Sequence, residues 1–235
     1  ASFYSTGGLV AVHAPKLERN AIYNSLYQRE VYATSGERIL LWFNLLDSEN
    51  GITPMGRERN ISQKPQFEVT AIGSFKQKSG CPEYVHTAMS AEEISRLCLN
   101  ECYNPSNERN KIDRIEIVKI TPTTELDSIS KNIQDPWKVF TCNDKGEGCS
   151  ANFFDDEYVL NNKSSLYYAR AIQEPTNMVG GDPLRCELNE AGECIKIRPC
   201  YSSGPDFDPN DDCLAPVGER AWSSPIFLTH PMSLY

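Results

Sequence analysis

The nine cysteines of this chain, all at or after residue 81, constrain its fold more than any other feature of the sequence. They are Cys81, Cys98, Cys102, Cys142, Cys149, Cys186, Cys194, Cys200 and Cys213. Free thiols at this density are unusual, whereas disulfides are common in periplasmic and secreted proteins. Zinc sites favour Cys-x2-Cys pairs, and this sequence contains none. The cysteines therefore predict disulfides and a periplasmic or secreted location.

Two cysteine pairs have the spacing of staples across β-hairpins. Cys142 and Cys149 enclose a turn with two glycines, and Cys186 and Cys194 enclose a turn with an asparagine and a glycine. Such residues readily adopt the positive φ angles that tight turns require. We therefore expect each pair to close its own hairpin.

The remaining cysteines leave the connectivity open. Cys200 and Cys213 could close a loop rich in proline and aspartate. Cys81, Cys98 and Cys102 form an odd set, in which two could bond to each other. The third would then be free or bonded to a group outside the chain, because sequence alone does not fix connectivity.

The first 37 residues have the pattern of a strand followed by a helix. Residues 8–12 are a short apolar run typical of a buried strand. A helix is expected over residues 16–31, with Leu17, Ala21, Ile22 and Leu26 on one apolar stripe. One such unit, half of a βαβ repeat, cannot bury both faces alone and needs neighbours that this chain does not supply.

From residue 38 onward the pattern predicts mainly antiparallel β-strands, with Gly, Pro, Asn and Asp in the turns. A short helix is expected over residues 91–98, where Ser90 and Glu93 form a capping box. The fold class predicted is α+β, with a βα unit followed by a disulfide-stapled β-sandwich-like domain. The expected strands span residues 39–46, 67–75, 112–120, 137–141, 151–154, 166–172 and 221–228.

Composition excludes several classes of partner. The formal net charge is −9, and the chain has no basic stripe of the kind that binds nucleic acid. No apolar run approaches the roughly 20 residues that cross a bilayer, so membrane insertion is not expected. The sequence also lacks an N-terminal signal peptide, which indicates a processed or truncated chain.

Two groups of residues are candidates for sites. Asp206, Asp208 and Asn210 supply oxygen ligands at alternate positions, with Asp212 close by, as in a calcium-binding loop. The pattern departs from an EF-hand because Asp211 replaces the glycine and no helices flank the loop; a solvated acidic turn is the alternative. Arg220 and Trp222 are expected to form a structural clamp by stacking or through a salt bridge.

Several segments resemble a family of uncharacterised bacterial proteins that are similar to the polymerase-and-histidinol-phosphatase (PHP) metal-dependent hydrolases. The resemblance covers nearly the whole chain, and its last segment is the most specific. The segments are 4–14, 21–39, 81–84, 101–105, 115–122, 135–140, 167–174 and 212–226.

This resemblance implies a truncated hydrolase. Residues 1–37 would be the last βα unit of an α/β barrel, and residues 38–235 a C-terminal β-rich domain with a long irregular segment at 174–216. The family's divalent-metal ligands lie upstream of this chain, so none can be assigned here. His13, at the end of the first strand, is the histidine that such a barrel would place near the metal pocket. The alternative is a surface or packed histidine, which is favoured because no second ligand lies at suitable spacing nearby.

The resulting functional hypothesis is a non-catalytic portion of a periplasmic or secreted metal-dependent hydrolase that acts on esters or phosphoesters. The chain itself would hold no cofactor apart from the candidate calcium, and its partner would be the upstream hydrolase domain. The alternative is a non-enzymatic interaction module that docks on another protein chain, with loops 47–65 and 174–216 as contact surfaces.

Overall fold

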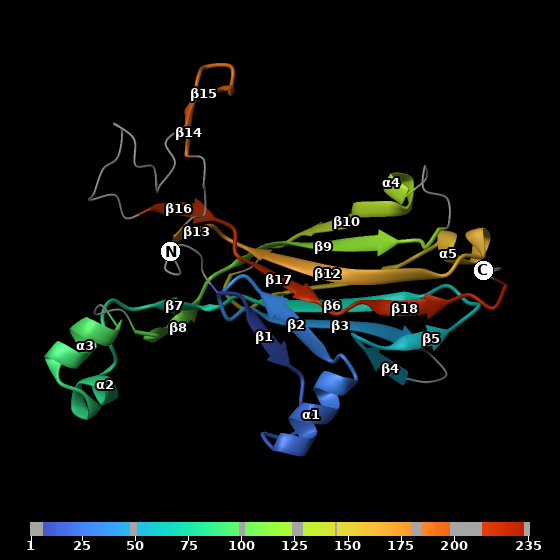
Figure 1. Ribbon diagram of the computed structural model, residues 1–235. Coiled ribbons are helices and arrows are strands. Elements are labelled where there is room, and N and C mark those ends of the chain that lie inside the picture. Colours follow the sequence, from blue (N-terminus) through green and yellow to red (C-terminus); the bar gives the residue numbers. More distant parts are fainter. Residues whose placement is uncertain are drawn as a thin grey trace.

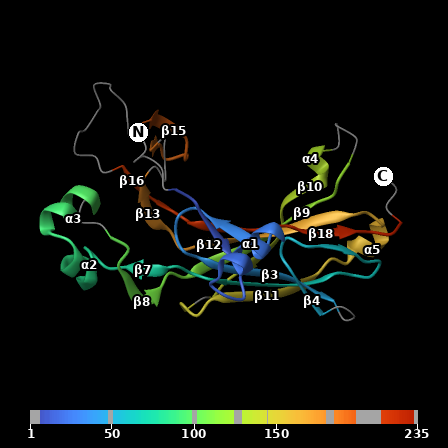
Figure 2. The same ribbon diagram turned by 60° about the horizontal axis from the view of Figure 1, so that its bottom comes forward.

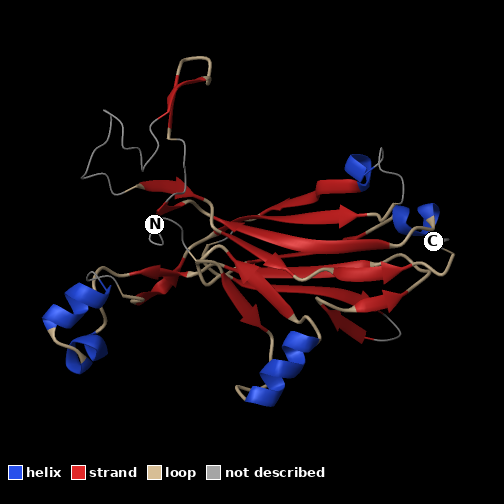
Figure 3. Ribbon diagram, in the orientation of Figure 1, coloured by secondary structure: helices blue, strands red, loops and turns tan. Residues whose placement is uncertain are grey.

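Two mostly antiparallel sheets dominate the computed structural model (Figure 1). It describes residues 7–47, 51–98, 102–123, 129–143, 145–179, 185–197 and 213–232. In Figure 1, strands β9, β10 and β12 lie above β3, β4 and β6, and Figure 3 shows that the helices lie at the periphery of the strands. The fold is therefore mainly β, as predicted from residue 38 onward, and its few helices give the predicted α+β class only loose support.

The larger sheet is built around β12, which pairs with β9 along one edge and with β17 and β18 along the other. Among the described residues it has eight strands, and its main path runs β1-β2-β17-β12-β18-β5, with β9 and then β10 on the far side of β12. The pair β18–β5 is parallel. The strands are β1 (Leu9–Val12), β2 (Val31–Thr34), β5 (Glu58–Asn60), β9 (Ile112–Ile120), β10 (Ile133–Thr141), β12 (Ser165–Gln173), β17 (Arg220–Ser223) and β18 (Ile226–Thr229).

The smaller sheet has the order β11-β6-β3-β4 and is antiparallel throughout. Its strands are β3 (Leu40–Asp47), β4 (Gly51–Pro54), β6 (Gln66–Ile72) and β11 (Cys149–Phe154). Along β3 and β6, buried residues alternate with half-buried ones, because successive side chains of a strand point to opposite faces. One face of this sheet therefore forms half of the core.

Aromatic side chains join the two sheets in the core. Phe67 stacks on Phe43 and Phe153, with ring centroids 5.5 and 5.1 Å apart. Tyr167, from β12 of the larger sheet, lies 4.7 Å from the Phe67 ring. All four side chains are buried, and each such burial stabilises the fold by about 1.5–3 kcal/mol.

The N-terminal segment forms a strand and a helix, as expected, but not a parallel βα unit. Helix α1 (Arg19–Tyr27) connects β1 to β2, and these two strands are antiparallel neighbours. Arg29, with φ of 60°, follows the helix, and the chain then returns beside β1. Strand β2 also pairs with β17, so residues on both sides of the boundary predicted at residue 37 share one sheet. No α/β-barrel unit is evident in the described part of the chain.

A small helical lobe lies at one end of the molecule (Figure 2). It holds α2 (Glu83–Ala88) and α3 (Ala91–Cys98), and it is connected to the β7 (Phe75–Gln77) and β8 (Pro105–Arg109) hairpin. The predicted capping box of α3 is present: Glu93 N donates to Ser90 Oγ at 3.2 Å, and Ser90 N donates to Glu93 Oε2 at 2.9 Å.

Three disulfides lie in the described part of the chain. Both predicted hairpin staples are confirmed, as Cys142–Cys149 and Cys186–Cys194, and the third bond is Cys81–Cys102. Cys142 follows β10 of the larger sheet and Cys149 begins β11 of the smaller one, so this bond links the two layers. Cys213 is also disulfide-bonded; the predicted partner, Cys200, lies outside the described residues.

The segment predicted to be irregular, 174–216, contains two short hairpin-like pairs. Strand β13 (Thr176–Val179) pairs with β16 (Leu214–Val217), and β14 (Cys186–Leu188) pairs with β15 (Cys194–Ile197). In the loop predicted at 47–65, β4 and β5 form. These strands are too short for sequence periodicity to identify them. The short helices α4 (Ile129–Asn132) and α5 (Glu157–Asn161) complete the fold.

Candidate functional site

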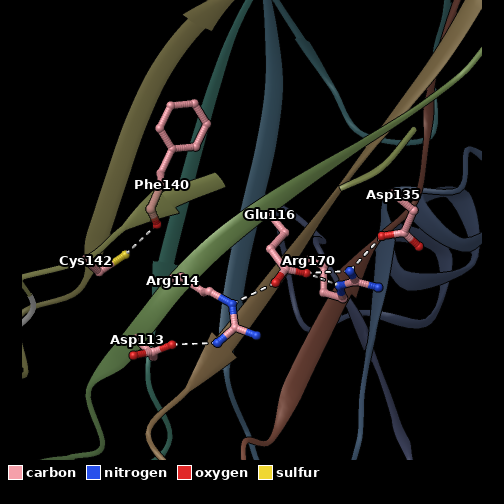
Figure 4. Close-up of polar contacts among 7 residues, drawn as sticks. All are labelled: Asp113, Arg114, Glu116, Asp135, Phe140, Cys142 and Arg170. Carbon is pink, nitrogen blue, oxygen red and sulfur yellow. Dashed lines mark hydrogen bonds and ion pairs between the residues drawn. The ribbon is translucent and has the colours of Figure 1, made fainter. Parts of the chain in front are cut away.

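A charged cluster with solvent access lies on the outer face of the larger sheet, on β9, β10 and β12 (Figure 4). On β9, Ile115 and Ile117 face the core, so the alternate residues Arg114 and Glu116 face outward. Arg170 on β12 stands opposite Glu116 in the strand register. We call the chain Asp113–Arg114–Glu116–Arg170–Asp135 the ionic ladder.

The ionic ladder runs along β9 to Arg170 on β12, which in turn contacts Asp135 on β10. Arg114 Nη1 donates to Asp113 Oδ2 at 2.7 Å, and Arg114 Nε donates to Glu116 Oε1 at 2.7 Å. Arg170 Nε donates to Glu116 Oε2 at 2.6 Å, and Arg170 Nη2 donates to Asp135 Oδ1 at 2.7 Å. Each oxygen of Glu116 therefore accepts a hydrogen bond from a different arginine.

A bulge in β10 allows Asp135 to take part. The pairing of β10 with β9 shifts register between Gln134 and Lys138, and Asp135 lies inside this interruption. From there its carboxylate reaches Arg170, two strands away. Bulges commonly re-aim a side chain in this way.

Electrostatics favour the charged forms of Glu116, Arg114 and Arg170. Burial acts to raise the pKa of Glu116, but the hydrogen bonds from Arg114 and Arg170 outweigh it and lower that pKa below its ordinary value. The hydrogen bond to Glu116 raises the pKa of Arg114. For Arg170, burial opposes the shift, but Glu116 and Asp135 raise its pKa. Glu116 is therefore a poor general base, and its oxygens are already occupied.

A second charged group lies on the inner face of the same strands. Lys119 Nζ is 2.6 Å from Asp155 Oδ2, and the two side chains are 4% and 0% exposed. Tyr167 Oη donates to Asp155 Oδ2 at 2.6 Å, and Glu157 N donates to Asp155 Oδ1 at 3.0 Å. The Lys119 ammonium also faces the ring of Trp137, at 5.1 Å. We call Lys119, Asp155 and Tyr167 the buried triad.

The buried triad is closed to solvent and stabilises the interface between the sheets. Burial, followed by the charge of Asp155, raises the pKa of Tyr167 far above its ordinary value. The phenol therefore stays protonated and serves as a hydrogen-bond donor. Sequence reasoning did not identify this group, although the strand period offered a signal: Lys119 has the parity of Ile115 and Ile117, which face the core.

A third buried carboxyl group ties β2 to the start of β17. Glu219 is 3% exposed and accepts a hydrogen bond from Ser35 Oγ. Burial raises the pKa of Glu219, although the bond from Ser35 partly opposes this shift. Ser35 Oγ also accepts a hydrogen bond from Arg220 N at 2.8 Å. These hydrogen bonds therefore join two segments that are distant in sequence.

The predicted site residues have different outcomes. Asp206, Asp208, Asn210 and Asp212 lie outside the described residues, so the calcium loop stays a prediction.

The predicted clamp of Arg220 and Trp222 also stays a prediction. Both residues lie on β17, inside the larger sheet between β2 and β12. Arg220 contacts Ser35 through its backbone, and Trp222 stands opposite Arg170.

His13 is held by the sandwich. Its Nε2 lies 2.8 Å from the carbonyl oxygen of Leu41, which requires this nitrogen to donate. Its ring lies 5.3 Å from the ring of Tyr32 and 5.7 Å from the ring of Trp42. A nitrogen that donates a proton to a carbonyl cannot at the same time bind a metal ion. In this arrangement His13 packs against β2 and β3.

Among the described residues, no group of three or more His, Cys, Asp or Glu side chains could hold a metal ion. Within the same ranges, none of the helices has the length and apolar character needed to cross a membrane. The charged groups of the ionic ladder and the buried triad are engaged in ion pairs and hydrogen bonds with one another.

Comparison with known proteins places the chain in a family. An uncharacterised protein of Chlamydia trachomatis serovar D is 40% identical over 182 residues, which is 77% of this chain but 23% of that protein. An uncharacterised protein of Chlamydia muridarum is 40% identical over 58 residues, or 25% of this chain and 8% of that protein. This chain thus spans about a quarter of the length of the first relative. No solved structure matches it significantly. The profile of a family described as "Protein of unknown function (DUF3604)" matches residues 1–230, and the protein therefore belongs to the DUF3604 family.

Proposed function

We propose that this chain is a non-catalytic β-sandwich part of a longer, periplasmic or secreted metal-dependent hydrolase that acts on esters or phosphoesters. The observation that carries the proposal is the pairing of carboxylates with other side chains among the described residues. Glu116 is held by two arginines, and Asp155 is held by Lys119 and Tyr167. Such groups stabilise a scaffold and leave the reacting groups to another part of the polypeptide.

Two further observations support this assignment. The segment resemblance to PHP-like proteins implies a barrel upstream whose metals activate water. The oxidised cysteines suit an extracytoplasmic compartment. The role of this chain would be to pack beside the barrel and to stabilise it.

The test uses the full-length polypeptide that contains this chain. We expect it to bind a divalent metal ion, measured by elemental analysis, and to hydrolyse p-nitrophenyl phosphate or ester substrates. The Glu116→Gln and Arg170→Lys variants should keep the kcat of the parent protein. A large loss of kcat in a variant that is still folded would contradict a non-catalytic role, and an absence of bound metal would contradict the hydrolase.

The second candidate function is a non-enzymatic interaction module. The stapled β14–β15 hairpin favours it, because Leu188, Ile195 and Ile197 are 62%, 67% and 49% exposed on this small element. Exposed aliphatic clusters often mark contact sites. A metal-free, inactive full-length protein that binds another chain, and loses that binding when Ile195 and Ile197 become serine, would favour this candidate.

A further inference from the structure

Helix α1 leaves an apolar face exposed, although Ala21 and Ile22 on its other side are half-buried. Its one buried residue is Ser25, whereas Tyr23, Leu26 and Tyr27 are 67%, 46% and 81% exposed. A surface helix of a folded protein normally turns its apolar stripe toward the core. The helix projects from the sheets in Figure 1 and comes to the front in Figure 2. Its apolar face is therefore available to a partner.

The helix has little stability of its own. It spans nine residues, its N-cap residue Glu18 makes no side-chain cap bond, and it has no acidic residue in its first turn and no basic residue in its last. Isolated helices shorter than about 12–15 residues are marginal in water. Packing of the exposed stripe against another surface would supply the missing stabilisation.

Strand β1, which precedes the helix, is an edge strand among the described residues. Strand β1 is the terminal strand of the larger sheet's main path, so one of its edges has no neighbouring strand among the described residues. Leu9 and Val10 on this strand are 42% and 68% exposed, and Leu17 in the following connection is 96% exposed. Proteins usually cover or blunt an apolar edge strand, because it otherwise pairs with other chains.

We infer that β1 and α1 form a docking surface for another part of the same longer polypeptide. That part would cover the apolar face of α1 with an apolar surface of its own, and it would pair a strand with the open edge of β1. The aligned region is 23% of the C. trachomatis relative, so most of that protein is available to provide such a surface. The inference rests on the proposed function only for the existence of the longer polypeptide, and not for its hydrolase activity.

Hydroxyl-radical labelling of the full-length polypeptide tests the docking surface without an activity assay. Tyr84 on α2 is the matched control, since it is 70% exposed here against 67% for Tyr23. We expect Tyr23 and Tyr27 to be labelled several-fold more slowly than Tyr84 and at a rate independent of protein concentration. Equal labelling of the three tyrosines would overturn the inference. Protection that disappears on dilution would overturn it too, because the occupant would then be a second copy.

Paired variants of the full-length polypeptide give a second readout. The side chains of Tyr23 and Tyr27 are exposed in this chain, so their replacement by serine leaves the sandwich core unchanged. We expect Tyr23→Ser with Tyr27→Ser to lower the melting temperature and to expose the α1 segment to protease, whereas Tyr84→Ser changes neither. If the double variant behaves like Tyr84→Ser, or if the natural polypeptide contains only these 235 residues, the inference fails. Loss of metal or hydrolysis alone would count against the proposed function and leave this docking surface intact.

Discussion

Ion pairs lie on both faces of β9 and β12, but those on the inner face are buried and those on the outer face have access to solvent. On the inner face, Lys119 and Asp155 are 4% and 0% exposed, and they lie among aromatic rings. On the outer face, Arg114 and Asp135 of the ionic ladder are 39% and 38% exposed. When an ion pair is broken, water can hydrate the remaining charge on the outer face but not in the core. Pairing is therefore obligatory in the buried triad and weakly stabilising in the ladder.

The largest effect is expected from Asp155→Ala. This change leaves the Lys119 ammonium without its carboxylate partner in the core and removes the acceptor of the Tyr167 hydroxyl. Breaking a buried pair in this way costs about 3–5 kcal/mol. The free energy of unfolding, measured by urea denaturation, should fall by this amount.

A matched control separates the loss of charge from the loss of packing. The combined variant Lys119→Met, Asp155→Leu and Tyr167→Phe replaces the buried triad by apolar groups of similar size. Such replacements are often neutral or stabilising, so this variant should recover most of the stability that Asp155→Ala loses. Equal destabilisation of both variants would show that the triad contributes through shape and not through pairing.

The stability that the Cys142–Cys149 disulfide contributes can be compared with that of the buried triad. Cys142→Ser with Cys149→Ser opens a loop with a sequence separation of 7, and the chain-entropy relation gives a loss of about 2–3 kcal/mol for a loop of this size. Urea denaturation under oxidising conditions measures it.

The disulfide Cys186–Cys194 has a sequence separation of 8 but staples the exposed β14–β15 hairpin. Replacing both cysteines by serine should change global stability by less than about 0.5 kcal/mol. A global loss as large as that for Cys142–Cys149 would mean that the hairpin unfolds together with the sandwich.

On the outer face, Glu116→Gln should lower the free energy of unfolding by about 1–2 kcal/mol at neutral pH, because both arginines lose a charged acceptor. The folded-state pKa of Glu116 lies below its ordinary value of 4.5. Its stabilisation is therefore complete above pH 4.5 and is lost as the pH falls through the folded-state pKa. Parent and variant should converge in acid; a constant difference over the whole pH range would contradict the ladder's electrostatic role.

For Glu219→Gln, the stability difference between parent and variant should depend on pH in the opposite direction. Burial raises the folded-state pKa of Glu219 above 4.5, so its ionisation above that pKa disfavours the folded state. As the pH falls, the parent protein should therefore gain stability relative to Glu219→Gln. Over the same fall in pH, it should lose stability relative to Glu116→Gln.

Within the ionic ladder the smallest effect is expected for Arg114→Ala, whose side chain is 39% exposed. Exposed ion pairs typically contribute about 0.2–1 kcal/mol, and Arg170 still holds Glu116 after this change. The loss should shrink further in concentrated salt, which screens exposed charges. A loss comparable to that of Asp155→Ala would remove the contrast between the two faces.

Local patterns made much of the fold predictable from sequence. Strand β9 and helix α3 have the predicted bounds, because a run of β-branched residues marks the strand and a capping box marks the start of the helix. The two hairpin staples followed from cysteine spacing and turn glycines. These signals require no knowledge of distant parts of the chain.

Features that depend on distant residues were not predictable. The antiparallel pairing of β1 with β2 depends on the turn after α1, and β2 finds its other neighbour in β17. The buried triad joins Lys119 and Asp155, which lie on different segments, and a lysine in a strand is usually solvated. Only the parity of Lys119 hinted at its place in the core, and no pattern indicated Asp155 as its partner.

The position of β17 has a consequence for the order of assembly. This strand sits between β2 and β12, and the contact between Ser35 and Arg220 spans 185 residues. Contacts of such long range form slowly, because a large loop must close before they stabilise the chain. A nascent polypeptide that has not yet reached residue 220 lacks the strand that joins the two halves of the larger sheet. The larger sheet is therefore expected to finish folding only after this region has been synthesised.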